Sequence, residues 1–557
     1  MKMSPQMQAD AALRPILEIE DLRIAFSGRG GESEAVKGVS LSVAPGEVLG
    51  LVGESGSGKT VTMLAAAGLL ERNGRIAGGR VRIAGQDVTR ASRGMLRPIR
   101  GAVVSMIFQN PRAALNPIRS VGDQIADAIR AHERVSKAQA HARAVALLTA
   151  VNFPRPEAQA RAYPHELSGG MCQRAMIAVA LACNPRLLIA DEPTTGLDPT
   201  TQKSVMDLLA GLIADRGMAM VLITHDLAMA AQYCARVAVM EQGALVETGL
   251  PRRIFLAPRH PYTQRLVAAS PTRGARIEDL VPPGTLPALP AAPAPTLGRP
   301  HLLEVIGLQK DFGGGARAVD GVSFTLNAGQ SLGLVGESGS GKSTTSRLVC
   351  RLLDADAGAI VFDGQDLAAT SERDFPRSPR RSDIQLVFQD PTDSLNPRFT
   401  AREAIADPLR RLGGLRGRAL EAAVRETADL VSFPQALLDR LPHQLSGGQK
   451  ARVGIGRAVC LRPKLMVLDE PTAALDVSVQ AVVLHLLERL RRELGMAYLF
   501  VSHDLNVVRM MCAETLVMKS GRIVEAAPTE TLFTAPEHPY TRSLLAAVPS
   551  LDALQGD

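Results

Sequence analysis

The chain has 557 residues, too many for one hydrophobic core, so two to four domains are expected. Aromatic residues make up only 3% and Trp is absent, which argues against the base-stacking surfaces of single-strand nucleic-acid binders. The net charge of +7 is mild for this length and favours a solvated surface, although a basic face toward anionic lipid stays open.

The sequence also bears on location. It contains no run of 18 uncharged apolar residues, so no transmembrane helix is predicted, and the segment after Met1 lacks the apolar stretch of a secretory signal. Six Cys are scattered without CxxC spacing, as is typical of reduced cytosolic thiols, and Cys234 and Cys512 are expected to be small buried residues. We therefore predict a cytoplasmic protein that meets the membrane only through a partner.

Two copies of one long pattern fill the chain. GESGSGKT begins at Gly53 and GESGSGKS at Gly336, and later motif pairs keep a constant spacing of 278 residues. Such spacing indicates a duplicated domain and not a short-repeat solenoid. The predicted division is a tail (1–15), a first domain (16–258) with an extension (259–280), a linker (281–300), and a second domain (301–535) with its own extension (536–557).

Within each copy, the first element with clear chemistry is a glycine-rich turn between an apolar strand and a helical pattern. Both turns fit G-x-x-x-x-G-K-[ST], the phosphate-binding P-loop. Glycines let backbone N–H groups wrap the phosphates, the lysine contacts the β- and γ-phosphates, and the hydroxyl binds Mg²⁺. The predicted ATP-binding residues are Gly53, Gly56, Gly58, Lys59 and Thr60, and in the second copy Gly336, Gly339, Gly341, Lys342 and Ser343.

The predicted fold class is α/β, with two P-loop domains. Short apolar runs at 47–52, 187–190 and 220–224 precede turns or helices, as in strands of a mostly parallel sheet buried on both faces. Segments 121–152 and 401–432 are rich in Ala and Leu with interspersed charges, and predict a helical subdomain inserted in each copy.

A pair of adjacent carboxylates ends one apolar strand of each copy. Because α/β folds bind ligands at the carboxyl edge of the sheet, Asp191 and Asp469 are predicted to hold Mg²⁺ through water. Glu192 and Glu470 are predicted to polarise the attacking water as general bases. A solvated strand-end pair is the alternative, and its recurrence downstream of both P-loops disfavours it.

Between the copies, residues 281–300 contain seven Pro and no acidic residue. Proline fixes φ and removes a hydrogen-bond donor, so this stretch is predicted to be an extended linker. At about 3.1 Å per residue it spans roughly 60 Å at most.

The motif LSGGM (167–171), repeated as LSGGQ (445–449), precedes the Asp-Glu strands by about twenty residues. In this context the sequence resembles ABC ATPases over nearly its whole length, with 16–258 and 301–535 as nucleotide-binding domains. The resemblance implies that this signature caps the γ-phosphate held by the opposite cassette. The residues concerned are Ser168, Gly169, Gly170, Ser446, Gly447 and Gly448.

The resemblance implies further roles. Gln109 and Gln389 match the Q-loop glutamine, which touches Mg²⁺ or water and senses the transmembrane partner. His225 and His503 match the switch histidine, and residues 196–198 and 474–476 match the D-loop. Candidates for stacking on adenine are Phe26 and Phe312, for which ordinary strand core stays open. The expected Mg²⁺ site residues are Thr60, Asp191 and Gln109, and Ser343, Asp469 and Gln389.

After each domain comes His-Pro-Tyr-Thr, at His260 and at His538. With FQNPRAALNP and FQDPTDSLNP this looks like the oligopeptide, dipeptide, glutathione and nickel importer group. Many relatives in that group carry a Cys-rich segment here, proposed to bind an iron–sulfur cluster. Neither extension contains Cys, so no cluster is predicted.

The resemblance predicts the ATP- and Mg²⁺-dependent motor of an importer at the cytoplasmic face of the inner membrane. Its expected partners are two transmembrane permease subunits and, indirectly, an extracytoplasmic substrate-binding protein. A tandem ATPase acting on ribosomes or nucleic acid, or an exporter motor, is the alternative. Two further hypotheses are that Leu115 and Leu395 are permease-docking contacts and not core, and that the two cassettes of one chain pair head to tail.

Overall fold

The computed structural model describes residues 14–28, 31–272, 274–281, 285–291, 300–313, 317–367, 370–392, 394–473, 475–551 and 554. The chain forms two compact units. Unit 1 contains the chain up to Leu197, Thr201–Val267 and the residues from Pro549 onward. Unit 2 contains Asp198–Thr200 and Ala268–Val548. The domain limits set from the sequence stay predictions.

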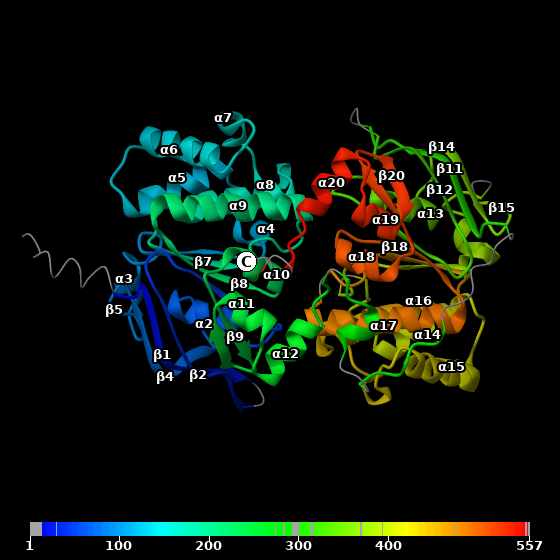
Figure 1. Ribbon diagram of the computed structural model, residues 1–557, viewed down its shortest axis with the longest axis horizontal. Helices are drawn as coiled ribbons and strands as arrows, with labels where there is room; N and C mark the ends of the chain where they lie inside the picture. The colour runs from blue at the N-terminus through cyan, green and yellow to red at the C-terminus, as the bar shows by residue number, and fades with distance from the viewer. Residues whose placement is uncertain are drawn as a thin grey trace, which may run out of the picture. The chain divides into compact units, whose positions relative to one another are not determined.

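The core of unit 1 is a six-stranded sheet with the order β10-β9-β3-β8-β7-β6, of which β7, β8 and β9 are labelled in Figure 1. All neighbours are parallel except the β9/β10 pair. Every residue of β7 and β8 is buried, which explains their unbroken apolar runs. The strands are β3 (Val48–Val52), β6 (Val104–Ile107), β7 (Leu187–Asp191), β8 (Ala219–Thr224), β9 (Arg236–Glu241) and β10 (Ala244–Gly249).

A second, antiparallel sheet of unit 1 has the order β2-β1-β4-β5. Its strands are β1 (Leu17–Gly28), β2 (Gly31–Val43), β4 (Gly74–Ile83) and β5 (Gln86–Asp87). Side chains of β1, β2 and β4 share one apolar cluster with alternate residues of β3, β7 and β8, so the two sheets pack face to face.

The helices of unit 1 include the predicted helical subdomain, in which α5 and α6 pack on each other and on α8. Ser120 and Ser136 cap α5 and α6, respectively, by accepting a backbone N–H. The helices are α2 (Lys59–Ala66), α3 (Arg93–Leu96), α4 (Pro111–Ala114), α5 (Val121–His132), α6 (Lys137–Ala150), α7 (Pro156–Gln159), η1 (Pro164–Glu166), α8 (Gly169–Ala180), α9 (Pro199–Arg216), α10 (Leu227–Tyr233), α11 (Pro251–Leu256) and α12 (Pro261–Ala268).

Unit 2 repeats both sheets. Its six-stranded sheet has the order β16-β17-β18-β13-β19-β20 with only β19/β20 antiparallel, and its four-stranded sheet has the order β12-β11-β14-β15. The strands are β11 (Leu303–Lys310), β12 (Val319–Leu326), β13 (Ser331–Val335), β14 (Ala357–Phe362), β15 (Gln365–Asp366), β16 (Ile384–Val387), β17 (Leu465–Asp469), β18 (Ala497–Val501), β19 (Glu514–Lys519) and β20 (Arg522–Pro528).

In unit 2, α14 and α15 pack on each other and on α16, so the second helical subdomain is also confirmed. The helices are η2 (Ile277–Leu280), α13 (Lys342–Val349), η4 (Phe375–Arg377), η5 (Pro379–Arg381), α14 (Ala401–Arg411), α15 (Gly417–Leu430), η6 (Gln435–Leu437), η7 (Pro442–Gln444), α16 (Gly447–Val459), α17 (Val477–Leu494), α18 (Leu505–Met511), α19 (Thr529–Thr534) and α20 (Pro539–Ala546).

The segment between the copies is only partly described, because 282–284 and 292–299 lie outside the described residues. Residues 285–291 form neither helix nor strand. Leu286 and Leu289 pack against the apolar core of unit 2, and the Arg492 guanidinium donates to the Pro290 carbonyl at 2.9 Å. This part of the predicted linker is therefore seated on unit 2.

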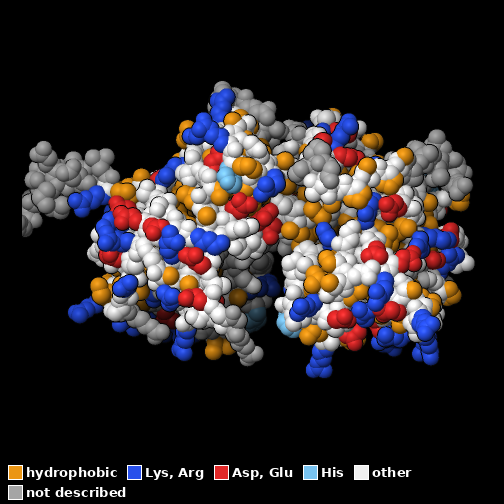
Figure 2. Space-filling model, turned by 90° about the horizontal axis from the view of Figure 1, so that it is seen from below, with side chains coloured by type: hydrophobic (Ala, Val, Ile, Leu, Met, Phe, Trp, Pro, Cys, Tyr) orange, Lys and Arg blue, Asp and Glu red, His pale blue; other side chains and the backbone are white. Residues whose placement is uncertain are grey.

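Cys234 and Cys512 are buried and carry free thiols, as predicted, and burial raises the pKa of each to about 12. Figure 2 shows basic and acidic side chains interspersed over the visible face, as expected of a solvated surface. In the described part of the chain, no helix is both long and apolar enough to cross a membrane.

The docking hypothesis for two leucines is wrong. Leu115 and Leu395 are only 4% and 3% exposed, and each lies in the apolar core that its helical subdomain shares with the large sheet. Leu115 follows α4, and its side chain belongs to the same buried apolar cluster as Val121 and Ile125 of α5, which removes it from water. The most exposed large apolar side chain near Leu115 is Ile118, at 81%.

We therefore predict that Leu115→Ala destabilises unit 1. Removing a buried leucine side chain costs about 2–5 kcal/mol of unfolding free energy, whereas an exposed substitution changes it by less than about 0.5 kcal/mol. Ile118→Ala is the matched control. Thermal and urea unfolding of both variants measures the difference, and equal stability of the two would contradict a core role for Leu115.

Candidate ATP site

Each P-loop connects a central strand of the large sheet to a helix. In unit 1 it joins β3 to α2, and in unit 2 it joins β13 to α13. The first glycine of each loop has a positive φ, 149° at Gly53 and 152° at Gly336. A Cβ there would lie 2.3 Å from the Met240 carbonyl oxygen, or 2.1 Å from that of Met518. Only glycine therefore allows the loop to pass this close to the neighbouring strand.

The P-loop lysines are buried within their own loops. Lys59 Nζ donates to the carbonyl oxygens of Gly53 and Glu54, both at 2.8 Å. In unit 2, Lys342 makes the equivalent bonds at 2.7 and 2.8 Å. Burial lowers the pKa of Lys342, and nearby carboxylates, Glu470 first, oppose that shift. Each loop thus holds a cation among backbone groups, the arrangement that a phosphate chain requires.

The hydroxyl after each lysine meets the aspartate predicted to share its metal. Thr60 Oγ1 donates to Asp191 Oδ1 at 3.0 Å, and Ser343 Oγ donates to Asp469 Oδ1 at 3.2 Å. Burial raises the pKa of Asp191 to about 6 and also raises that of Asp469. A hydroxyl and a buried carboxylate form the all-oxygen pair that suits a hard divalent cation, and such a cation would favour the charged carboxylate.

The predicted general bases lie one residue beyond these aspartates, at strained backbone positions. Glu192 and Glu470 have φ of 46° and 49°, in the left-handed region that side-chain-bearing residues avoid. In unit 1, Glu192 Oε2 accepts from Gln109 Nε2 at 2.7 Å, and Oε1 lies 3.1 Å from His225 Nδ1. Thr195 adds a hydroxyl donor at 2.9 Å, which the sequence analysis missed.

Unit 2 reproduces the glutamine and histidine contacts, whereas Ala473 stands where unit 1 has Thr195. Gln389 Nε2 donates to Glu470 Oε2 at 2.7 Å, and His503 Nδ1 lies 3.1 Å from Glu470 Oε1. The structure therefore brings the predicted P-loop lysine, carboxylates, glutamine and histidine together at one edge of each large sheet.

Strand order explains why these residues meet. In unit 1, β3, β8, β7 and β6 are consecutive parallel neighbours, so their carboxyl ends share one edge. The P-loop follows β3, His225 follows β8, Asp191 and Glu192 lie at the end of β7, and Gln109 follows β6. Adjacent strands thus deliver adjacent functional groups.

The two neighbouring carboxyls differ in their electrostatics. Burial by itself would raise the pKa of Glu192, but the hydrogen bond with His225 and its charge hold that pKa at about 2. The pKa of Glu470 is lowered in the same way by His503. Burial alone would lower the pKa of His503, yet its contact with Glu470 raises it. Such glutamates stay ionised, so they suit orienting and polarising a water.

The signature residues lie at the N-termini of α8 and α16. Ser168 Oγ accepts from the Met171 N–H, and Ser446 Oγ accepts from the Gln449 N–H, both at 3.3 Å. In unit 2 only, Gln449 Oε1 also accepts from the Ser446 N–H at 2.9 Å and closes a capping box. Both serines are exposed, and their pairing with a nucleotide of the opposite cassette stays a prediction.

The second glycine of each signature has a packing reason. A Cβ at Gly170 would lie 2.9 Å from Thr201, and one at Gly448 would lie 2.5 Å from Val479. The glycines therefore let α8 and α16 approach the helices that follow the D-loops. Of the second D-loop, Ala474 lies outside the described residues.

The two candidate adenine-stacking residues differ. Phe26, in β1, is half-buried and packs against the core of unit 1 beside Gly74. Phe312 is 62% exposed, with the Lys310 ammonium 5.8 Å from its ring centroid. An exposed ring suits stacking and a packed ring suits strand core, so stacking on adenine stays a prediction for both residues.

One pair of contacts to the P-loops was missed from the sequence. Tyr262 Oη accepts from the Glu54 N–H at 2.9 Å, and Tyr540 Oη accepts from the Glu337 N–H at 3.0 Å. The two partners lie 208 and 203 residues apart in sequence. The His-Pro-Tyr-Thr repeat was the available signal, but it identifies a family without indicating what its tyrosine contacts.

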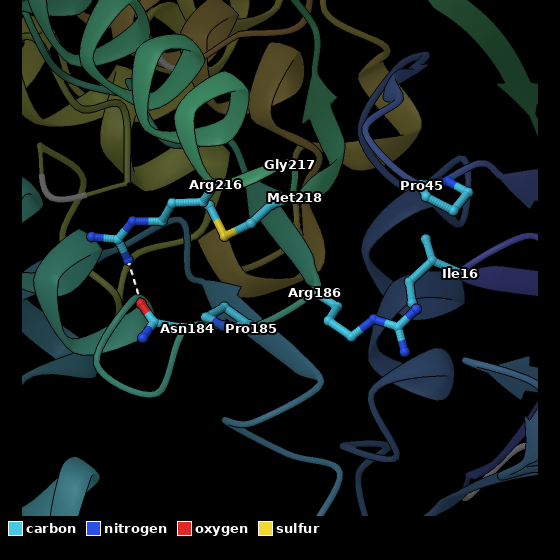
Figure 3. Close-up of a pocket in the computed structure, with 8 residues that line it drawn as sticks. All are labelled: Ile16, Pro45, Asn184, Pro185, Arg186, Arg216, Gly217 and Met218. Carbon is cyan, nitrogen blue, oxygen red and sulfur yellow. Dashed lines mark hydrogen bonds between the residues drawn. The ribbon is translucent and has the colours of Figure 1, made fainter. Parts of the chain in front are cut away.

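A cavity of about 570 Å³ lies elsewhere in unit 1 (Figure 3). Arg186 and Met218 in its lining precede β7 and β8, and Pro45 precedes β3. The cavity is therefore at the amino edge of the parallel strands, opposite the P-loop. Its Arg216 already donates to Asn184 Oδ1 at 2.8 Å (Figure 3), so this guanidinium has a partner within the fold.

Two P-loop units with Asp-Glu strands, signature helices and switch histidines define a tandem ATPase with two ABC-type domains. The ABC transporter family model matches residues 36–195 and 319–473, and the chain belongs to that family. A second model, the C-terminal region of oligopeptide/dipeptide transporters, matches 246–295 and 524–556.

Curated relatives match over nearly the full length. The glutathione import ATP-binding protein GsiA of Escherichia coli (strain K12) is 43% identical over 564 residues, covering 96% of this chain and 89% of the relative. GsiA of Salmonella typhimurium (strain LT2) is 43% identical over 567 residues, with 97% and 90% covered. A solved bacterial ABC transporter cassette, MJ0796, is 27% identical with a TM-score of 0.38, covering 41% of this chain and 98% of its own.

Proposed function

We propose that this chain is the ATP-hydrolysing motor of an importer for peptides or similar small solutes such as glutathione, and that both of its ATP sites are competent. The observation that supports this proposal is the complete set of P-loop lysine, Asp-Glu pair, glutamine and histidine in each unit, at matching distances. The oligopeptide/dipeptide C-terminal region and the name of the full-length relatives favour this class of cargo.

Each residue of the site has a separate proposed role in ATP hydrolysis. Lys59 would release its carbonyl partners to meet the β- and γ-phosphates. Thr60, and Asp191 through water, would hold Mg²⁺, which would supply positive charge to neutralise the phosphates. Glu192, kept ionised, orients the attacking water, and Gln109 and His225 fix its carboxylate. Lys342, Ser343, Asp469, Glu470, Gln389 and His503 take the same roles in unit 2.

We predict that each site hydrolyses ATP. Glu192→Gln and Glu470→Gln remove the charge that polarises water but keep the side-chain size, so each single variant should retain turnover or ATP occlusion at the unmodified site. Steady-state ATPase assays and trapped-nucleotide counts measure this. If one substitution abolishes all hydrolysis while the other has no effect, only one site is active.

The partners follow from the importer class. We propose that the chain sits at the cytoplasmic face of the membrane, bound to two permease subunits that an extracytoplasmic binding protein supplies with solute. The stretches after Gln109 and Gln389 are the proposed receiving surfaces. Because Leu115 and Leu395 are buried in the apolar core, we propose that exposed neighbours such as Ile118 contact the permease instead.

Purification from solubilised membranes tests the importer role against a ribosomal one. Tagged chain should co-purify with two polytopic membrane proteins in equal amounts, and Ile118→Asp should weaken that association while ATP binding is unchanged. The association is scored by mass spectrometry of the washed complex. Recovery of ribosomal proteins or nucleic acid in place of permeases would support the alternative function.

We also propose that one chain forms its own ATP sandwich, with Lys59 facing Ser446 and Lys342 facing Ser168. Covalent connection raises the effective concentration of the second cassette to about the millimolar range, which favours pairing within a chain. The competing arrangement pairs the same copy of two chains.

Mass distinguishes the two arrangements. The Glu192→Gln, Glu470→Gln double variant should retain ATP without cleaving it, so its closed form accumulates. In light scattering without permease, this form is expected to remain one chain of 59.1 kDa. A stable two-chain species that appears only with ATP would overturn pairing within the chain.

A further inference from the structure

The His-Pro-Tyr-Thr motif builds a rigid helix start that aims a tyrosine at the P-loop. His260 Nδ1 accepts from the Tyr262 N–H at 3.3 Å, and His538 Nδ1 accepts from the Tyr540 N–H at 3.1 Å. Proline occupies the first position of α12 and of α20, where its missing N–H costs nothing. The tyrosines are 4% and 6% exposed, so their rings are fixed by packing.

The turn before each helix is tied to the last strand of the large sheet. Glu247, in β10, accepts backbone N–H groups from Arg259 and His260, both at 3.1 Å. Glu525, in β20, accepts those of Glu537 and His538 at 2.8 and 3.1 Å. A carboxylate that accepts two N–H groups in each copy is a strong anchor, so the tyrosine is positioned by the sheet and not by a free tail.

Each tyrosine hydroxyl reaches the peptide group that starts the P-loop. In unit 1, the Glu54 N–H donates to Tyr262 Oη at 2.9 Å, while the carbonyls of Gly53 and Glu54 accept from Lys59. The hydroxyl and the lysine therefore hold the same two residues from different sides. Unit 2 repeats this arrangement with 3.0 Å from Glu337 N to Tyr540 Oη.

We propose that Tyr262 and Tyr540 are positioning residues for the two ATP sites. Each hydroxyl fixes the first turn of its P-loop in the orientation from which the lysine and the backbone N–H groups meet the phosphates. Nucleotide affinity then depends on the seating of the C-terminal extension. The inference rests on the proposed ATPase function and gives the extension a part in it.

Removing only the hydroxyl tests the role. Loss of one hydrogen bond to a P-loop that must stay ordered should weaken ATP binding by about three- to tenfold. Tyr262→Phe and Tyr540→Phe should each raise the KM of their site, with little change in kcat, and the double variant should raise it at both sites. ATP affinity by calorimetry and steady-state kinetics report the two quantities separately.

The chain offers matched controls. Tyr233 in unit 1 donates its hydroxyl proton to Asp207 at 2.6 Å, and Tyr498 in unit 2 donates to the Leu487 carbonyl at 2.8 Å. Tyr233→Phe and Tyr498→Phe also remove a hydroxyl from a packed ring, and they are expected to change thermal stability without changing KM. Glu247→Gln tests the same site indirectly. It weakens the hydrogen bonds that hold the turn before α12, so it should also raise KM, but by a smaller factor than Tyr262→Phe.

The outcomes separate this inference from the proposed function. If the unmodified chain neither binds nor hydrolyses ATP, the proposed function fails. If it does both, and Tyr262→Phe with Tyr540→Phe binds ATP as the unmodified chain does, whatever its melting temperature, the positioning role is overturned. Should the double variant not fold, the single variants and Glu247→Gln decide by the same KM criterion.

Discussion

Two adjacent carboxylates at the end of a buried strand are the constraint on which each unit is built. Asp191 is the last residue of a strand with no exposed residue and Glu192 follows it, in surroundings where an uncompensated charge is costly. Their surroundings drive their pKa values apart, to about 6 for Asp191 and about 2 for Glu192. The compensating groups, Thr60, Gln109 and His225, come from three other elements, so the strand order β3-β8-β7-β6 is a requirement of the chemistry.

Duplication shows which features the site requires and which it tolerates. The lysine, glutamine and histidine contacts recur within about 0.1 Å between units, because any change would leave a buried charge without its partner. The two copies differ at positions where water can replace a contact that one copy lacks. Phe26 is packed while Phe312 is exposed, and Met171 replaces the Gln449 that completes a capping box. Any difference in turnover between the sites would arise from such positions.

Much of this architecture could be predicted because motifs and apolar runs are local signals. The strand at 187–190 and the helical subdomain at 121–152 need only neighbouring residues to be recognised. The inward position of Leu115 could not be predicted, since a loop has no periodicity that separates core from surface. The difference between Phe26 and Phe312 depends on tertiary neighbours such as Gly74, and the contact of Tyr262 with Glu54 spans 208 residues.

A P-loop needs external anchors because the glycines that make it possible also loosen it. Gly53, Gly56 and Gly58 all take positive φ, and glycine loses more conformational freedom on folding than any other residue. In the proposed cycle Lys59 cannot anchor the loop throughout, because the carbonyls of Gly53 and Glu54 that hold it would release it to phosphate. The Glu54 N–H bond to Tyr262 does not compete with that exchange. A framework that survives nucleotide binding must therefore come from outside the loop, and the C-terminal extension provides it in both units.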